Sequence, residues 1–240
     1  MAYGNLKQIN KIEPASFIWH KLFLENQIPA NGTVIEVAPG YEPKIGNALV
    51  MLEFSGTVFL IEPDERAAHY IEELYQQILP RAAVNIVVKP LQYVEVGVDV
   101  PSGIDALLAS HPFDDMVMAS IVRQPSFFSE EREGGADSSA SIKKLYDIIG
   151  RKDYERGIET ALATWKHFIR RAKPVYFIAS QYPSRMLTMK GLTKRQESGF
   201  IVLKQLKNFY KNFLREQNRD ASLGYKGDPK CWIIARKPYI

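Results

Sequence analysis

The chain has 240 residues, 46% of them hydrophobic, and a formal net charge of +4 at neutral pH. This length and composition suit one large domain with its own core, and no apolar run approaches the roughly 20 residues that a membrane span requires. The charge is unevenly divided, since residues 1–140 carry 9 basic and 19 acidic side chains and residues 141–240 carry 22 and 8. Two interpretations stay open: attraction of nucleic acid, an acidic lipid surface or an anionic substrate, and ordinary solvated helix faces.

The N-terminus and the cysteine content indicate the compartment. Residues 1–8 lack the basic-then-apolar order of a secretory signal peptide. Cys231 has no second cysteine to pair with, and the apolar run at 231–235 predicts a buried small side chain rather than a catalytic thiol. We therefore expect a cytoplasmic protein.

The first part of the chain alternates short strands with helices. Three strands rich in apolar and β-branched residues are predicted at 33–38, 57–61 and 84–88. Between the first two, Pro43 suits the first position of a helix and Gly56 ends that helix. Asp64 is predicted to cap the helix that follows the second strand.

The second part continues the alternation and then changes character. A fourth strand is predicted at 115–119, a long helix at about 153–172, a fifth strand at 175–179, and an antiparallel edge pair at 200–206 and 230–236. Apolar strands that alternate with helices indicate a parallel sheet covered on both faces. The expected fold is therefore α/β: a doubly wound, mostly parallel seven-stranded sheet with helices on both faces and an antiparallel C-terminal edge strand.

The domain organisation follows from the continuity of this pattern. We expect one domain over 1–240, with an N-terminal helical cap at 1–30 and an insertion or lid at 123–150. Residues 124–141 are polar, rich in Gly and Ser, and too numerous for a routine connection. They are interpreted either as a mobile lid over a site or as a surface insertion.

Two residues at successive strand ends point to a ligand. In open parallel sheets, ligands bind beyond the carboxyl ends of the strands. Gly40 follows the first strand and allows close backbone approach, and Glu62 follows the second strand, where a carboxylate can accept hydrogen bonds from both ribose hydroxyls. Either residue alone has an ordinary explanation, as a turn glycine or a helix cap. Together, about 20 residues apart, they indicate a nucleoside site.

These residues lie in segments that resemble class I S-adenosylmethionine-dependent methyltransferases. The similar segments are 33–40 for the first motif, 56–62 for the second, 113–120 for the fourth-strand motif, and 198–202 with 232–238 for the edge pair. The resemblance implies a Rossmann-like methyltransferase domain with S-adenosyl-L-methionine as its cofactor. The chain departs from the family where three spaced glycines are usual, because it has Ala38, Gly40 and Glu42 there.

The resemblance also implies the cofactor site. It assigns Glu36, Ala38 and Gly40 to the methionine end and Glu62 to the ribose, while Gln92 would lie near adenine and Ser120 and Ile121 beside the sulfonium. Glu42 could meet the cofactor's ammonium group. The whole implied set is Glu36, Ala38, Pro39, Gly40, Glu42, Glu62, Pro63, Gln92, Ser120 and Ile121. No zinc-ligand spacing occurs, so no metal is expected.

The expected activity is direct in-line methyl transfer, in which alignment of the reactants supplies most of the acceleration. No general base is assigned: His20 beside Trp19 could face the acceptor or pack as an ordinary histidine, and His69, His111 and His167 have no better claim.

The acceptor and the oligomeric state are not identified. Residues 119–125 lack the Asn/Asp-Pro-Pro-aromatic motif of enzymes that modify exocyclic base amines, and no separate RNA-binding module occurs. A small molecule is therefore favoured, although the basic C-terminal half keeps RNA open. Two alternatives remain: a non-catalytic binding protein that retains the methyltransferase fold, and a nucleotide-dependent dehydrogenase, which the glycine spacing suits poorly.

Overall fold

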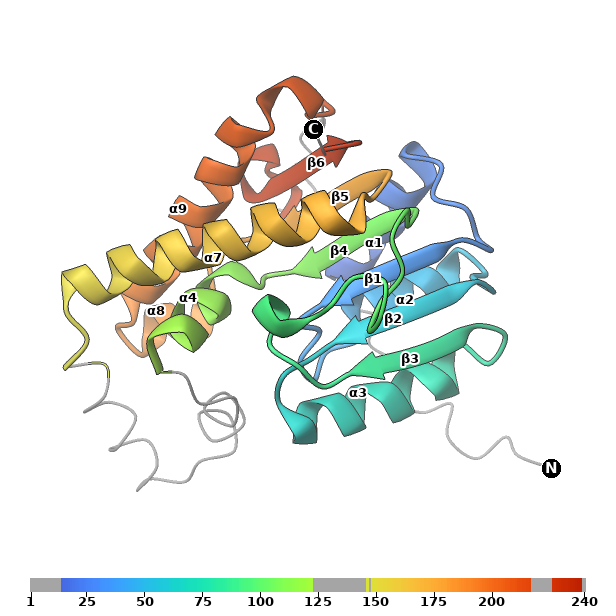
Figure 1. The fold of residues 1–240 in the computed structure, drawn as a ribbon, viewed down its shortest axis with the longest axis horizontal. Helices are drawn as coiled ribbons and strands as arrows, with labels where there is room; N and C mark the ends of the chain where they lie inside the picture. The colour runs from blue at the N-terminus through green and yellow to red at the C-terminus, as the bar shows by residue number, and fades with distance from the viewer. Residues whose placement is uncertain (1–13, 123–145, 147, 217–225, 239–240) are drawn as a thin grey trace.

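The computed structural model describes residues 14–122, 146, 148–216 and 226–238. These residues form a six-stranded sheet in the order β3-β2-β1-β4-β5-β6 (Figure 1). Its strands are β1 (Thr33–Val37), β2 (Thr57–Ile61), β3 (Ala83–Val87), β4 (Ala106–Ser110), β5 (Tyr176–Ser180) and β6 (Trp232–Arg236). Every neighbouring pair is parallel except β5 and β6, which run antiparallel. The expected α/β sheet with an antiparallel C-terminal edge strand is thereby confirmed.

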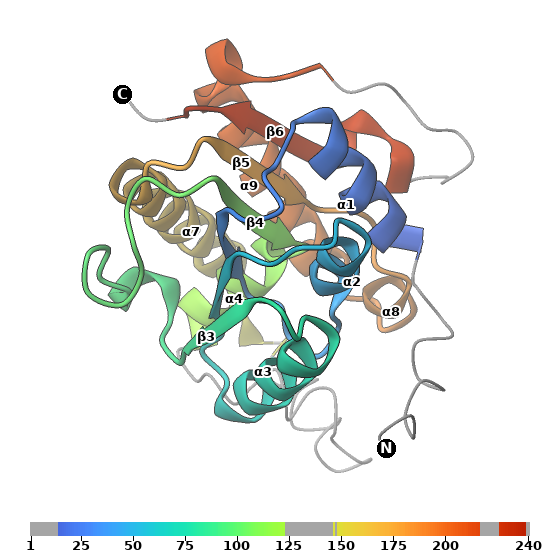
Figure 2. The same cartoon turned by 90° about the vertical axis from the view of Figure 1, so that its right-hand side faces the viewer.

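Helices cover both faces of this sheet (Figure 2). One core cluster joins Ile35 and Leu107 to the helices α4 (Phe113–Val122), α7 (Arg151–Ala172) and α9 (Thr193–Phe209). The other joins Val34 and Leu108 to α1 (Pro14–Glu25), α2 (Lys44–Met51) and α3 (Glu65–Ile78). Successive strand residues therefore point into different cores, which explains why the central strands are apolar throughout. Short elements complete the chain: α8 (Arg185–Met189), η1 (Leu91–Tyr93), η2 (Lys211–Phe213) and η4 (Pro229–Cys231).

The N-terminal helix belongs to the second of these cores. Trp19 on α1 is fully buried, and its ring lies 5.0 Å from the ring of Trp232 on β6. The helical part of the expected 1–30 cap is thus described from Pro14 onward. Most of the 123–150 insertion, including all of 124–141, lies outside the described residues.

The predicted fourth strand is wrong. Residues 115–119 lie inside α4, and the strand that occupies this place in the sheet is β4. A short apolar run does not by itself distinguish a buried strand from a buried helix. Phe113 and Val117 lie one helical turn apart and are both fully buried against the core that contains α7. Tertiary packing thus decides for helix over 113–122.

The predicted strand at 200–206 is also wrong, and this removes the seventh strand. These residues belong to α9, where Val202, Leu203 and Leu206 are buried at helical spacing. They pack into the core that contains α4 and α7. The edge pair therefore consists of β5 and β6.

Within the described ranges, no helix combines the length and the apolar character needed to cross a membrane.

Candidate functional site

The turn after β1 has an unusual backbone. Ala38 and Gly40 both have positive φ, 54° and 61°. Glycine adopts this conformation freely, whereas alanine pays roughly 1–2 kcal/mol for it. The Ala38 N–H donates to the Ile61 carbonyl at 2.8 Å, which ties the turn to the end of β2. Ala38 therefore stands in a backbone conformation that favours glycine.

Glu62 joins this turn to the next one. Its Oε2 accepts a hydrogen bond from the Gly40 N–H at 2.9 Å, and its Oε1 accepts one from the Asp64 N–H at 3.2 Å. Asp64 caps α3, as predicted, because its Oδ1 accepts from the N–H groups of Arg66 and Ala67. The carboxylate of Glu62 thus lies between the two turns, and it is buried.

A narrow hollow, which we call the slot, opens between these two turns and α4. It encloses about 470 Å³, including its open mouth. Most of its surface is apolar, and the residues around it are Ala38, Gly40, Tyr41, Glu62, Pro63, Asp64, Ala67, Asp115, Met116 and Ala119. An apolar slot with carboxylates at one side suits a flat heterocycle attached to a hydroxylated sugar.

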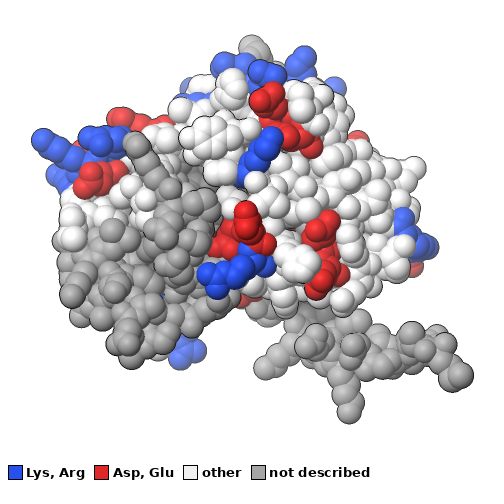
Figure 3. Space-filling view, turned by 60° about the horizontal axis from the view of Figure 1, so that its bottom comes forward, with Lys and Arg blue, Asp and Glu red and all other residues white. Residues whose placement is uncertain are grey.

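A wider hollow, which we call the groove, adjoins the slot. It encloses about 1250 Å³, including its open mouth, and shares Ala38, Tyr41 and Asp115 with the slot. Its other walls come from the turns after β1, β4 and β5, from α8, and from the residues Arg195 and Lys226. Figure 3 shows acidic and basic side chains interspersed on one face of the molecule rather than gathered by sign. The two hollows therefore share part of their walls.

A buried acid lies behind the first turn. Glu36 on β1 is 1% exposed and accepts a hydrogen bond from the Tyr75 hydroxyl of α3. Burial raises the pKa of Glu36 to about 8, although the Tyr75 hydrogen bond and the Lys44 charge oppose this rise. The α2 helix crosses Tyr75 at Gly46, where a Cβ atom would lie 2.6 Å from the Tyr75 ring. Glu36 is therefore bound to α3 through Tyr75 and lines neither hollow.

A charged network is buried at the ends of β4 and β5. Asp114 accepts from Gln181 Nε2 at 2.8 Å and from Arg195 Nε at 3.3 Å. Arg195 also pairs with Asp115 and donates to the Tyr146 hydroxyl. Burial alone would raise the pKa of Asp114, but the nearby His111 and Arg195 charges hold it well below its usual range. The network joins α4, β5 and α9 beside the groove.

His111 is held at both ring nitrogens. Its Nδ1 lies 3.3 Å from Asp114 Oδ1, and its Nε2 contacts the Tyr182 carbonyl, which can only accept a hydrogen bond. Burial alone would lower the pKa of His111, but the Asp114 carboxylate raises it above its ordinary value. Both ring nitrogens are therefore engaged by neighbouring groups in the groove wall.

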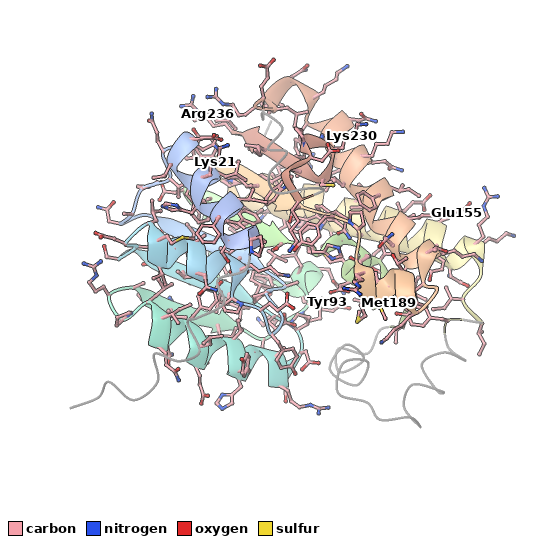
Figure 4. All side chains as sticks on the ribbon, turned by 180° about the vertical axis from the view of Figure 1, so that it is seen from behind. Lys21, Tyr93, Glu155, Met189, Lys230 and Arg236 are labelled. Carbon is pink, nitrogen blue, oxygen red and sulfur yellow. The ribbon has the colours of Figure 1, made fainter. Side chains whose placement is uncertain are left out.

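The structure brings together most, but not all, of the predicted cofactor residues. Those that border the slot or the groove are Ala38, Pro39, Gly40, Glu42, Glu62 and Pro63. Gln92 is exposed on η1 beside Tyr93, which is 66% exposed and stands at the surface (Figure 4). His20 on α1 also borders neither hollow.

Ser120 and Ile121 lie on α4 but turn away from the slot. The Ser120 hydroxyl donates to the Met116 carbonyl of its own helix, and Ile121 packs into the core that contains α7. Asp115, Met116 and Ala119 border the slot in their place. Local sequence patterns carry no signal for this, because a strand at 115–119 would present different side chains to the slot than the helix does.

The described residues contain no cluster of three or more His, Cys, Asp or Glu side chains that could hold a metal ion.

Comparisons with known proteins show the fold. No protein-family model and no curated protein match the sequence. Among solved structures, the chain is similar to a candidate O-methyltransferase from Nostoc punctiforme, with a TM-score of 0.51, 10% identity, and 95% of this chain and 56% of that one covered. It is also similar to a candidate rRNA methylase from Clostridium thermocellum, with a TM-score of 0.50, 13% identity, and coverage of 94% and 98%. The chain therefore has the class I methyltransferase fold.

Some of the similar proteins are much longer. The chain spans 28% of the bifunctional kinase-methyltransferase WbdD, with a TM-score of 0.40 and 11% identity over 70% of this chain. The fold rests on the two structures with TM-scores of 0.50 and 0.51, and at their low identities the similarity establishes the fold alone.

Proposed function

We propose that this chain, with its class I methyltransferase fold, is an S-adenosylmethionine-dependent methyltransferase that acts on a small-molecule acceptor. The observation that carries the proposal is the slot itself. A positive-φ turn at Ala38 and Gly40, a carboxylate at Glu62 and the apolar surface of α4 meet around it. These are the features that a nucleoside needs at the carboxyl ends of parallel strands.

The residues present fit the cofactor. The Glu62 carboxylate accepts hydrogen bonds from the N–H groups of Gly40 and Asp64 and borders the slot, where an acceptor of this kind suits the ribose hydroxyls. Pro63, Met116 and Ala119 supply apolar surface for the base. The Ala38–Glu42 turn borders the groove, and the ion pair between Glu42 and Lys44 lies in the groove wall, where the amino-acid part of the cofactor would lie.

The departure from the glycine pattern does not obstruct the site. Ala38 holds the positive φ that a glycine would adopt. The Glu42 side chain is 59% exposed and borders the groove rather than the slot. This favours an active enzyme over a binding protein that keeps only the fold.

When bound, the cofactor supplies a methyl group that is already activated as a sulfonium. The chain's own residues then bind and align the two reactants, which can provide most of the rate acceleration. The groove is the place for the acceptor, because it adjoins the slot. Asp114 and His111 are both engaged by their neighbours, so we assign neither of them as a general base.

Calorimetric titration with S-adenosylmethionine and S-adenosylhomocysteine, with NAD as the control, tests the cofactor proposal. We expect micromolar binding of the first two, about −8 kcal/mol, and its loss in Glu62→Ala. Glu62→Gln, which keeps one carbonyl oxygen, should show an intermediate affinity, and thermal melting checks that each variant folds. No binding at millimolar ligand by the folded wild type would refute the proposal.

Transfer of a labelled methyl group tests the acceptor. The protein is incubated with methyl-labelled S-adenosylmethionine and, separately, with total RNA and with a small-molecule extract. We expect label in the small-molecule fraction, since the groove is lined by side chains of both charge signs. Label in RNA would overturn the small-molecule assignment. Micromolar cofactor binding without transfer to either would favour the non-catalytic binding protein.

A further inference from the structure

We propose that Asp64 is a specificity-determining residue that accepts a hydrogen bond from the adenosine part of the cofactor through its Oδ2. This inference rests on the proposed function and names a contact that the nucleoside motif does not include. The sequence predicts only that Asp64 caps α3. The structure shows that the cap occupies one of its two oxygens.

The two carboxylate oxygens of Asp64 have different surroundings. Oδ1 accepts from the Arg66 N–H at 3.0 Å and from the Ala67 N–H at 3.2 Å. Oδ2 is buried, and no group among the described residues donates a hydrogen bond to it. The whole residue is only 3% exposed. An unpaired buried carboxylate oxygen is costly, so a donor at this position is strongly favoured.

Asp64 borders the slot, where such a donor can come from the ligand. It lies two residues after Glu62, and both side chains line the same hollow. The remaining slot surface is mostly apolar. Gln92, the residue expected near adenine, is exposed and borders neither hollow.

An adenosine moiety has two kinds of donor that suit Oδ2: the ribose hydroxyls and the exocyclic amino group of adenine. Both present a hydrogen to a carboxylate oxygen, which in its ionised form can only accept. The shared chemistry is therefore a neutral donor on the nucleoside. Analogues that lack one donor at a time identify which of them is used.

Two substitutions distinguish the proposed role of Asp64 Oδ2 from the role of Oδ1 in the cap of α3. In Asp64→Asn, the cap requires the amide oxygen to face the N–H groups of Arg66 and Ala67. The amide NH₂ then takes the place of Oδ2, where it can only donate and so cannot accept the hydrogen bond from the nucleoside. In Asp64→Ser, the hydroxyl can keep the cap while the second oxygen is removed. Asp228→Asn is the matched control, because Asp228 also caps a helix, with its Oδ1 accepting from the Lys230 N–H, and borders neither hollow.

S-adenosylhomocysteine is the probe, and calorimetry gives its affinity. We expect Asp64→Asn and Asp64→Ser to bind it roughly 10- to 100-fold more weakly than the wild type, with the affinity of Asp228→Asn unchanged. Thermal melting and far-ultraviolet circular dichroism check that each variant is folded. Folded Asp64 variants with wild-type affinity would overturn the inference and leave the proposed function intact. A folded wild type that does not bind would instead overturn the proposed function, and the inference with it.

Analogues then locate the contact. S-inosylhomocysteine lacks the amino group, and the 2′-deoxy and 3′-deoxy forms of S-adenosylhomocysteine each lack one hydroxyl. The analogue without the partner of Asp64 should lose affinity for the wild type but show little further loss for Asp64→Ser, because the contact is already absent there. If every analogue loses affinity equally in both proteins, Asp64 makes no contact with the nucleoside.

Discussion

The two halves of the site are built in different ways. Around the turns after β1 and β2, the key contacts join residues close in sequence: Glu62 reaches back 22 residues to Gly40 and forward two to Asp64. At the ends of β4 and β5, Asp114 meets Gln181 and Arg195 across 67 and 81 residues. The first half uses the Glu62 carboxylate, backbone N–H groups and an apolar slot, and the second uses paired charges.

The first half of the site is therefore concerned with ligand binding, and the second with the packing of the domain. Backbone N–H groups and a strand-end carboxylate are available wherever a parallel βαβ unit forms, so the first half can bind a nucleoside with locally encoded parts. The charged network exists only when α4, β5 and α9 have all docked. Removing one of its charges should therefore lower the free energy of unfolding of the whole domain. Changes around the slot should mainly lower the affinity for the ligand.

Arg195→Met should give the largest loss of stability. Arg195 is 3% exposed and compensates two acids, Asp114 and Asp115, beside the groove. Its removal leaves the Asp114 charge buried with less compensation, which typically costs about 3–5 kcal/mol. Urea unfolding measures this loss. Arg151→Ala, which breaks an exposed ion pair with Glu155, should cost less than about 1 kcal/mol. Equal losses of stability in the two variants would mean that the buried network contributes no more than an exposed ion pair.

The same division, between local and long-range contacts, separates the parts of the fold that the sequence predicts from those that it does not. Strands β1, β2, β3, β5 and β6 and the Asp64 cap follow from local residue patterns, and the structure has them within a residue or two of the predicted bounds. The assignment of 115–119 and 200–206 as strands failed, because short apolar runs carry no period that separates strand from helix. The choice was made by packing between α4, α7 and α9, which local patterns do not contain.

The site was predictable to the same extent. The turn at Ala38–Glu42 and the position of Glu62 follow from strand-end logic. The roles of His111, Asp114 and Arg195 do not, because nothing near any of them in the sequence reveals its distant partners. Asp64 shows an intermediate case: its cap was predictable, but the burial of its second oxygen was not.

Glu36→Gln should change how stability depends on pH. Burial raises the pKa of Glu36 from 4.5 to about 8, so the folded protein holds a proton that the unfolded chain releases above pH 4.5. The stability contributed by this residue is fully present below that pH and is lost, by about 1.4 kcal/mol per pH unit, as the pH rises toward 8. Glutamine imitates the protonated acid, so the variant should lose this slope and gain stability relative to the wild type at pH 7.5.

Chemical denaturation between pH 5 and 8 measures that slope. Glu155→Gln, which changes an exposed acid on α7, should leave it unaltered. Parallel curves for the wild type and Glu36→Gln would mean that Glu36 is ionised in the folded protein.

Gly199→Ala tests the close approach of α9 to the network. A Cβ at this position would lie 2.9 Å from the Asp114 backbone nitrogen and 2.9 Å from Gln181 Nε2. Overpacking of this kind costs about 1–3 kcal/mol, which should exceed the gain in helix propensity from alanine. Gly150→Ser is the control, because its Cβ would meet nothing closer than 3.5 Å. Unchanged stability of Gly199→Ala in urea would show that α9 can move away from α4 at no cost.

His111→Gln should give the smallest loss of stability, and the pH dependence of that loss reports whether the imidazole is protonated. The neighbouring carboxylate of Asp114 raises the pKa of His111 in the folded protein. The stability that the imidazolium contributes is therefore fully present below its unfolded value near 6.5 and is lost as the pH rises through the raised folded value. We expect His111→Gln to be less stable than the wild type by about 1–2 kcal/mol at pH 6, with a smaller difference in stability at pH 9.

His69→Gln, on the exposed face of α3, is the control and should match the stability of the wild type at both pH values. A gap for His111→Gln that is equal at both pH values would mean that the imidazole is neutral in the folded protein, which would leave one ring nitrogen free to act as a base in the groove.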